Sequence, residues 1–153
     1  MAMKVGEILF VDTNILLTAT DRSRERHQAA QRILGASARN CFHLAMSGQI
    51  IREYLVVATR PLEVNGLGLS AGDALRNVEE FQRRLVIYDE TEAVSRRLCT
   101  LVRDAALRGK RIHDANVAAT MLIHGISKLV TENPGDFANF AGIEIVNIDD
   151  LVE

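Results

Sequence analysis

The sequence predicts an α/β fold in which helices cover both faces of a parallel sheet. Short apolar, β-rich runs alternate along the chain with longer segments of helical periodicity, and no repeat of fixed period is present. Strands that alternate with helices favour parallel pairing, because each helix returns the chain to the same end of the sheet. The 153 residues are close to the size of one domain, so we expect a single domain over residues 1–153.

The first part of the chain is expected to form two strands and three helices. Residues 7–11 (EILFV) are predicted to be a strand buried on both faces, and a helix follows at once. Helical spacing of apolar residues then covers residues 24–34, before a second strand at residues 41–46. The third helix covers residues 48–59 and ends before Pro61, because proline disfavours helical backbone in the residue before it.

The middle of the chain predicts one helix and one strand. Ser70 followed by Asp73 resembles a capping box, which marks the start of a helix. The apolar face of this helix is expected to consist of Leu75, Val78 and Phe81. Residues 85–88 (LVIY) are predicted to form the third strand.

Two helices and two strands complete the expected fold. The first of these helices has the clearest amphipathic stripe, formed by Val94, Leu98, Leu101, Val102 and Ala105. The second is expected over residues 114–124 and ends at Gly125. Residues 128–131 and 143–148 are predicted strands, which brings the sheet to about five strands.

The composition argues against several classes of protein. With only 2 prolines and 10 glycines, the chain is neither collagenous nor of low complexity. No apolar run approaches the roughly 18 residues that cross a bilayer, and Asp12 interrupts the N-terminal run, so we expect no membrane span and no signal peptide. Cys41 and Cys99 lack the spacing of a zinc or disulfide scaffold, and we expect both to be buried as small hydrophobic residues. The expected location is cytoplasmic.

Charge is distributed unevenly, although the formal net charge is only −2. Residues 96–111 carry one acid, Asp104, among six basic residues: Arg96, Arg97, Arg103, Arg108, Lys110 and Arg111. After Lys128 the chain has acids and no basic residue. A basic surface beside an acidic centre would suit an enzyme that binds a polyanion and cuts it with a metal ion. The alternative is that these arginines only keep a helix face solvated.

Four acids are expected near the carboxyl ends of the strands, where parallel sheets have their functional sites: Asp12, Glu53, Asp114 and Asp136. In such sheets the active crevice lies beyond the carboxyl ends of the strands, where the strand order reverses. Each acid also has a purely structural interpretation. Asp12 and Asp114 would serve as helix N-caps, Glu53 would lie at the border of its helix face, and Asp136 would stabilise a turn.

Clustered carboxylates imply a cation, because they raise one another's pKa unless a positive charge neutralises them. Oxygen ligands without pairs of Cys or His favour Mg²⁺ or Mn²⁺ over zinc. Such an ion activates water and stabilises the leaving oxygen of a phosphodiester. The four acids therefore predict metal-assisted phosphoryl chemistry.

Four segments that contain these acids resemble, in order, the signature segments of PIN-domain ribonucleases, and most closely the VapC-type toxins of toxin–antitoxin pairs. They are FVDTNILL, IIREYLVVATRP, RIHDANVAATMLIHGI and LVTENPGDF. The resemblance covers the chain from about residue 9 to residue 148. It implies a three-layer α/β/α PIN-like fold with a central, mostly parallel sheet. It also implies a divalent-metal-dependent endoribonuclease that forms a homodimer and has a small cognate antitoxin.

The resemblance also assigns roles to individual residues. Asp12 and Asp114 would bind the principal Mg²⁺ or Mn²⁺, with Glu53 as a ligand or as the group that orients a water. The fourth position of the metal shell would be filled by Asp136, Asn133 or a bridging water. Supporting polar positions are Thr13, Asn14, Thr131 and Asn133. His113 is expected to pack or to make hydrogen bonds rather than to act as an acid or base.

Three alternatives are open at this point. A haloacid-dehalogenase-like phosphatase has a second Asp where this chain has Asn14. A receiver domain of two-component signalling has paired acids early in the chain and a late Lys, which are missing here. The third alternative is a catalytically inert PIN-like module that binds RNA or protein.

Overall fold

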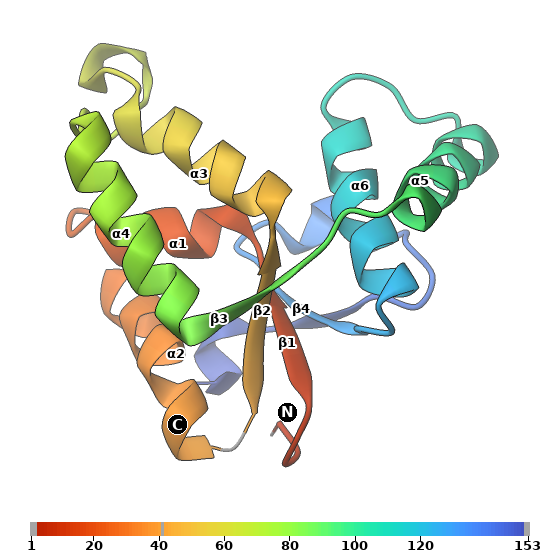
Figure 1. Ribbon diagram of the computed structural model, residues 1–153, viewed down its shortest axis with the longest axis horizontal. Helices are drawn as coiled ribbons and strands as arrows, with labels where there is room; N and C mark the ends of the chain where they lie inside the picture. Colours follow the sequence, from red (N-terminus) through yellow and green to blue (C-terminus); the bar gives the residue numbers. More distant parts are fainter. Residues whose placement is uncertain (1–2, 41, 152–153) are drawn as a thin grey trace.

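The computed structural model of the chain describes residues 3–40 and 42–151, and it confirms the three-layer α/β/α architecture (Figure 1). Its centre is a five-stranded sheet in the order β3-β2-β1-β4-β5, with every neighbouring pair parallel. The strands are β1 (Ile8–Val11), β2 (His43–Ser47), β3 (Leu85–Tyr88), β4 (Lys128–Val130) and β5 (Glu144–Val146).

Helices cover both faces of this sheet, as Figure 1 shows. Four helices pack on one face: α1 (Thr13–Thr20), α2 (His27–Asn40), α3 (Gly48–Thr59) and α4 (Ala71–Arg84). On the other face, α5 (Glu92–Ala105) packs against α6 (Arg111–Ile123). Short 3-10 helices complete the described chain: η1 (Leu62–Val64), η2 (Pro134–Asp136) and η3 (Ile148–Leu151). None of the helices in the described part of the chain is long and apolar enough to cross a membrane.

The strand order reverses between β1 and β4. The chain passes from β1 to β2 to β3 in one direction, and then returns through α5 and α6 to place β4 on the other side of β1. Val11 pairs with Val130 at the carboxyl ends of these two strands, and the amide of Asp12 donates to the carbonyl of Val130 at 3.1 Å. Asp12 and Thr131, the next residues on each strand, therefore emerge side by side at the point where such folds place their sites.

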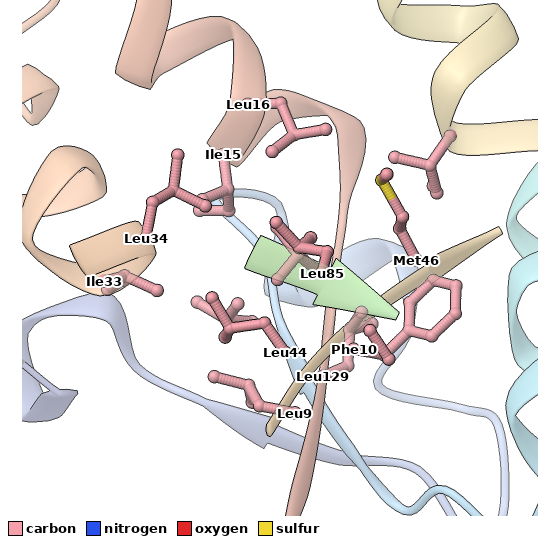
Figure 2. Close-up of a cluster of buried hydrophobic side chains, with 14 of the residues drawn as sticks. Leu9, Phe10, Ile15, Leu16, Ile33, Leu34, Leu44, Met46, Leu85 and Leu129 are labelled. Atoms are coloured by element: carbon pink, nitrogen blue, oxygen red, sulfur yellow. The ribbon is translucent and has the colours of Figure 1, made fainter. Parts of the chain in front are cut away.

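The hydrophobic core lies mainly between the sheet and helices α1 to α4 (Figure 2). Leu9, Phe10 and Val11 of β1 are fully buried, as expected for a central strand with helices on both faces. Ile15 and Leu16 of α1 lie against them and are also fully buried. Burying a side chain of this size contributes roughly 2 kcal/mol, so the core fixes the position of Asp12 at the end of β1.

The helix expected over residues 24–34 begins later than predicted, because a turn precedes it. The carboxylate of Asp21 accepts hydrogen bonds from the amide and the hydroxyl of Ser23, at 3.0 and 2.6 Å. This local bonding competes with helical bonding, so α2 starts only at His27. The strand predicted at residues 41–46 is observed as His43–Ser47, and Cys41 lies outside the described residues.

Helix α6 begins three residues before the predicted start. Gly109, at φ +60°, turns the chain, and the amide of Ile112 already donates to its carbonyl. Asp114 therefore lies within the first turn of α6 and is not its N-cap, so that structural interpretation of Asp114 was wrong. Strands β4 and β5 are shorter than the predicted segments 128–131 and 143–148.

Three predictions about which side chains face the core were also wrong. Cys99 is exposed, because it lies one position, or about 100° of rotation, beyond the half-buried Leu98 on α5. Leu75 is 50% exposed because Ala74 occupies the core-facing position of α4 beside it. Of the residues predicted for the stripe of α5, Val94 is fully buried and Ala105 is exposed.

Candidate active site

The carboxyl edge of the sheet brings together four predicted acids from four different elements. Asp12 directly follows β1, Glu53 lies in α3, Asp114 in the first turn of α6, and Asp136 at the end of η2. Their charges interact, since Glu53 and Asp136 both raise the pKa of Asp12, and all three raise the pKa of Asp114. The fold thus places side chains separated by more than 100 residues at one point.

Asp12 is both a helix cap and a member of this cluster. One carboxylate oxygen, Oδ1, accepts from the amide of Thr13 at 2.8 Å and caps α1. The other, Oδ2, accepts from the hydroxyl of Thr131 at 2.8 Å and from Nδ2 of Asn14 at 3.4 Å. The two interpretations of Asp12 are therefore compatible, because different oxygens face the cap and the β4 side of the site.

Thr131 and Asn14 join β1 to β4 beside Asp12. Nδ2 of Asn14 donates to the Thr131 hydroxyl oxygen at 3.1 Å, and its Oδ1 accepts from the amide of Glu132 at 3.2 Å. The amide of Asn133 also donates to the Thr131 hydroxyl oxygen, at 3.1 Å. With these acceptor positions used, the Thr131 hydroxyl hydrogen is directed to Asp12. The side chain of Asn133 is exposed, and its part in this network is played by its backbone.

Thr13 connects Asp12 with Glu53. Its hydroxyl donates to Oε2 of Glu53 at 2.7 Å, while its backbone amide donates to Oδ1 of Asp12, the cap of α1. Thr13 is 7% exposed, so this hydrogen bond is shielded from water. The other oxygen of Glu53, Oε1, accepts from Nε2 of Gln49 at 2.9 Å.

Three polar residues around Glu53 were missed by the sequence analysis: Gln49, Glu90 and Asn116. Gln49 is 1% exposed, and its Nε2 also donates to the carbonyl of His113 at 2.9 Å. Nδ2 of Asn116 donates to Oε1 of Gln49 at 2.7 Å and to Oε1 of Glu90 at 2.6 Å. Only Gln49 had a signal in the sequence, since it precedes Glu53 by four residues and shares its helix face.

Burial and mutual repulsion raise the pKa of two acids. For Asp12 burial is the main cause, opposed by the hydrogen bonds from Thr131 and Thr13. For Asp114 burial and the charges of Asp136 and Asp12 raise the pKa to about 6. The site therefore holds more negative charge than its surroundings compensate.

Among the described residues of the basic segment 96–111, Arg111 is the one whose side chain is seen in contact with these acids. Its Nε lies 3.8 Å from Oδ2 of Asp114 and partly offsets the raised pKa of that carboxyl. Its Nη2 lies 3.5 Å from the carbonyl oxygen of Asp136. Asp136 itself is exposed, as is His113, whose carbonyl oxygen accepts from Gln49.

The donor set fits a hydrated, hard divalent cation. A bound cation would relieve the repulsion that raises the pKa of Asp12 and Asp114. Within residues 3–40 and 42–151, no three side chains of Asp, Glu, His or Cys are already arranged to coordinate one ion together. Mg²⁺ retains several waters and uses one or two carboxylates, so it does not require such a closed cage, whereas structural zinc does.

Comparison with known proteins gives a consistent result. The PIN domain family model matches residues 9–143. Ribonuclease VapC24 of Mycobacterium tuberculosis is 30% identical over 139 residues, which cover 87% of this chain and 91% of that protein.

Solved structures share the fold at lower identity. VapBC2 from Rickettsia felis, bound to a promoter DNA fragment, has a TM-score of 0.68 at 19% identity and covers 92% of this chain and 98% of its own. VapC20 of Mycobacterium tuberculosis, described as a toxin that cleaves the sarcin-ricin loop, has a TM-score of 0.63 at 17% identity, with 89% and 98% covered. The family model and the VapC24 relative together confirm the resemblance read from the four segments: this chain belongs to the PIN domain family, as a VapC-type member.

Proposed function

We propose that the chain is an endoribonuclease that cleaves RNA phosphodiester bonds with metal-activated water, using Mg²⁺ or Mn²⁺. The observation that carries this proposal is the set of four acids at the reversal of strand order, two of which have a raised pKa. The VapC24 relative is named a ribonuclease, which supports the same reaction. We further propose that residues 1–153 act as one PIN-like domain.

In this mechanism Asp12 and Asp114 would hold the principal ion. When bound, Mg²⁺ or Mn²⁺ supplies an activated water and offsets the charge that develops on the phosphate. Glu53 would bind the ion or orient a water beside it, and Asp136, which is exposed, would complete the first or second shell.

The supporting polar residues keep the carboxylates in position. Thr13 fixes one oxygen of Glu53, and Thr131 and Asn14 fix Oδ2 of Asp12. Asn133 supports Thr131 through its backbone amide. Such supporting contacts commonly change metal affinity or activity by about 10- to 100-fold.

We also propose that the chain is the toxin of a VapBC-type pair, with a small antitoxin that blocks the acidic site. Several structures of similar fold are VapBC complexes, which supports a protein partner of this kind. A homodimer is proposed as well. Exposed apolar side chains at the end of α3 and in η1 would suit contact with a second copy, namely Val56, Leu62 and Val64.

The test uses protein freed of bound partners and stripped of metal. Structured and unstructured RNA would be incubated with Mg²⁺, Mn²⁺ or EDTA, and Asp12→Asn would be prepared in parallel to expose contaminating ribonuclease. We expect cleavage that requires the metal and is lost in the variant. Cleavage at the wild-type rate by Asp12→Asn would remove the mechanism. Well-folded protein that neither cuts RNA nor binds Mn²⁺ would indicate an inert binding module.

A further inference from the structure

A pocket of about 670 Å³ lies beside the acid cluster and shares a wall with it. Thr131 and Glu132, at the end of β4, form the shared wall, and Thr131 is the residue whose hydroxyl donates to Asp12. The lining also includes Arg24 and Arg26, from the turn before α2. We call this the side pocket. Its volume lies within the range of about 300–1,000 Å³ that is common for ligand sites.

The polar groups of the side pocket are held in place by one another. The buried hydroxyl of Thr18 donates to Oε2 of Glu132 at 3.0 Å and accepts from Nη1 of Arg24 at 3.2 Å. Nε of Arg24 lies 3.4 Å from the carboxylate of Asp21. Arg24 is therefore fixed at the wall of the pocket before any ligand arrives, which lowers the entropy lost on binding.

Arg26 is held less firmly and is free to exchange its partner. Its Nη2 lies 3.4 Å from Oδ2 of Asp149, and the two side chains are 44% and 62% exposed. An exposed pair of this kind contributes little stability. A phosphate oxygen can therefore replace Asp149, because a guanidinium binds phosphate through two parallel hydrogen bonds.

A polyanion that approaches four acids needs positive charge close by. Arg24 and Arg26 provide it next to Thr131, on the β4 side of the acid cluster, in a pocket that Glu25 and Glu132 also line. Pro134 and Ile145 add apolar surface to the same pocket, and Asn147 adds an amide. Together these groups match a nucleotide, whose base has an apolar face and a polar edge, and whose phosphate is anionic. Unpaired RNA exposes its bases in this way.

We propose that the side pocket binds a nucleotide next to the cleaved bond of single-stranded RNA, with Arg24 and Arg26 on the flanking phosphates. The inference rests on the proposed ribonuclease function and adds to it a defined substrate path. It places the strand across the reversal of the sheet order, from the acid cluster towards β5.

The experiment measures RNA binding separately from cleavage. Fluorescence anisotropy with a labelled single-stranded RNA would be recorded in EDTA, in the Asp12→Asn background, over a series of salt concentrations. The double variant Arg24→Gln, Arg26→Gln would be compared with a control double variant, Arg32→Gln, Arg83→Gln, which changes the net charge equally at exposed positions of α2 and α4, outside the basic segment 96–111. Thermal midpoints and Mn²⁺ titrations, with Asp12 restored, would accompany both pairs.

The side-pocket pair is expected to weaken RNA binding by at least about fivefold. It should also make the negative slope of the log of the binding constant against log salt shallower by about 1.4. That slope corresponds to two lost phosphate contacts at roughly 0.7 each for a single strand. The control pair on α2 and α4 is expected to leave the slope near the parent value, and both pairs should bind Mn²⁺ as the parent does. Arg26→Gln alone, at an exposed position, gives about half the change in slope if the double variant folds poorly.

Three results would overturn the inference. An unchanged slope in a protein that cleaves RNA would exclude the side pocket from the RNA path and leave the ribonuclease function intact. Equal weakening by the two pairs would show only general electrostatic attraction. A wild-type chain that neither binds nor cuts RNA would remove the proposed function and this inference together.

Discussion

The carboxylate of Asp12 both caps α1 and belongs to the acid cluster, and two substitutions distinguish these roles. Asparagine keeps an oxygen that accepts from the amide of Thr13, and it is as good a cap as aspartate. Asp12→Asn is therefore expected to fold normally and to cleave RNA at least about 100-fold more slowly than the wild type. This loss is larger than the one expected for substitution of a supporting residue. Asp12→Ala should lose cleavage equally, and about 1 kcal/mol of stability in addition. Urea unfolding together with a cleavage assay tests both variants. A loss of stability in Asp12→Asn as large as that in Asp12→Ala would contradict the prediction for Asp12→Asn.

Gln49 is an uncharged residue that holds the carboxylate of Glu53 in position. Its amide gives one hydrogen to Glu53 and one to the carbonyl of His113, and its oxygen is fixed by Asn116. Gln49→Met keeps the volume and removes these bonds. We expect Mn²⁺ affinity to fall by about 10- to 100-fold, as calorimetry would measure.

A control on the same helix tells positioning from general damage. Thr59→Val removes an exposed hydroxyl that bonds the carbonyl of Leu55, at the far end of α3. It should leave Mn²⁺ affinity unchanged. If Gln49→Met unfolds more easily yet binds Mn²⁺ as the wild type does, Gln49 is only a structural residue.

Helix α3, which carries Glu53, has its N-terminus capped by a residue from another element. The side chain of Ser47 makes no capping hydrogen bond, and its buried oxygen has no partner among the described residues. Oε2 of Glu90, from the segment between β3 and α5, accepts from the amide of Gln49 at 3.0 Å instead. A carboxylate at this end of a helix also interacts favourably with the helix dipole.

This arrangement predicts opposite outcomes for two neighbouring side chains. Glu90→Ala is expected to destabilise the protein by about 1 kcal/mol, because it removes the cap of α3. Ser47→Ala should be neutral or slightly stabilising, since it removes a buried hydroxyl without a partner in the described chain. Urea unfolding of both variants is the measurement. A larger loss in Ser47→Ala than in Glu90→Ala would mean that the cap is wrongly assigned.

The stability of the whole molecule should depend on pH through the acid cluster. The pKa of Asp114 is raised from 3.8 to about 6, so between these values the folded chain binds more protons at this site than the unfolded chain. The free energy of unfolding that this group contributes is therefore highest below pH 3.8, falls as pH rises to about 6, and is level above.

Asp114→Asn isolates this contribution. In EDTA the variant is expected to be more stable than the wild type at pH 7, on the order of 2 kcal/mol at most, and equal to it near pH 4. Urea unfolding of both proteins at the two pH values measures this difference in stability. Asp21, whose pKa is lowered by its bonds to Ser23, has the opposite pH dependence, but it is present in both proteins and its contribution drops out of the comparison. A difference that does not change with pH would show that Asp114 titrates normally.

Much of the fold follows from patterns along the chain. The apolar run at β1, the alternation of strands and helices, and the Ser70 cap of α4 depend on neighbouring residues, and all three are confirmed. The four acids were also found in this way, because strand ends and helix starts have recognisable neighbours. Where local turns compete with a helix, as at Asp21 and Gly109, the predicted boundaries were wrong.

The surroundings of the site depend on contacts between distant parts of the chain. Gln49 lies 41 positions from Glu90 and 67 from Asn116, and no local pattern links them. Residue patterns encode periodicity and nearby hydrogen bonds, so they specify which elements form and which acids end them. The reversal of strand order determines which of these residues meet, since it sets β4 beside β1 and brings the first turn of α6 to Gln49 at the start of α3. Only the folded chain contains that information.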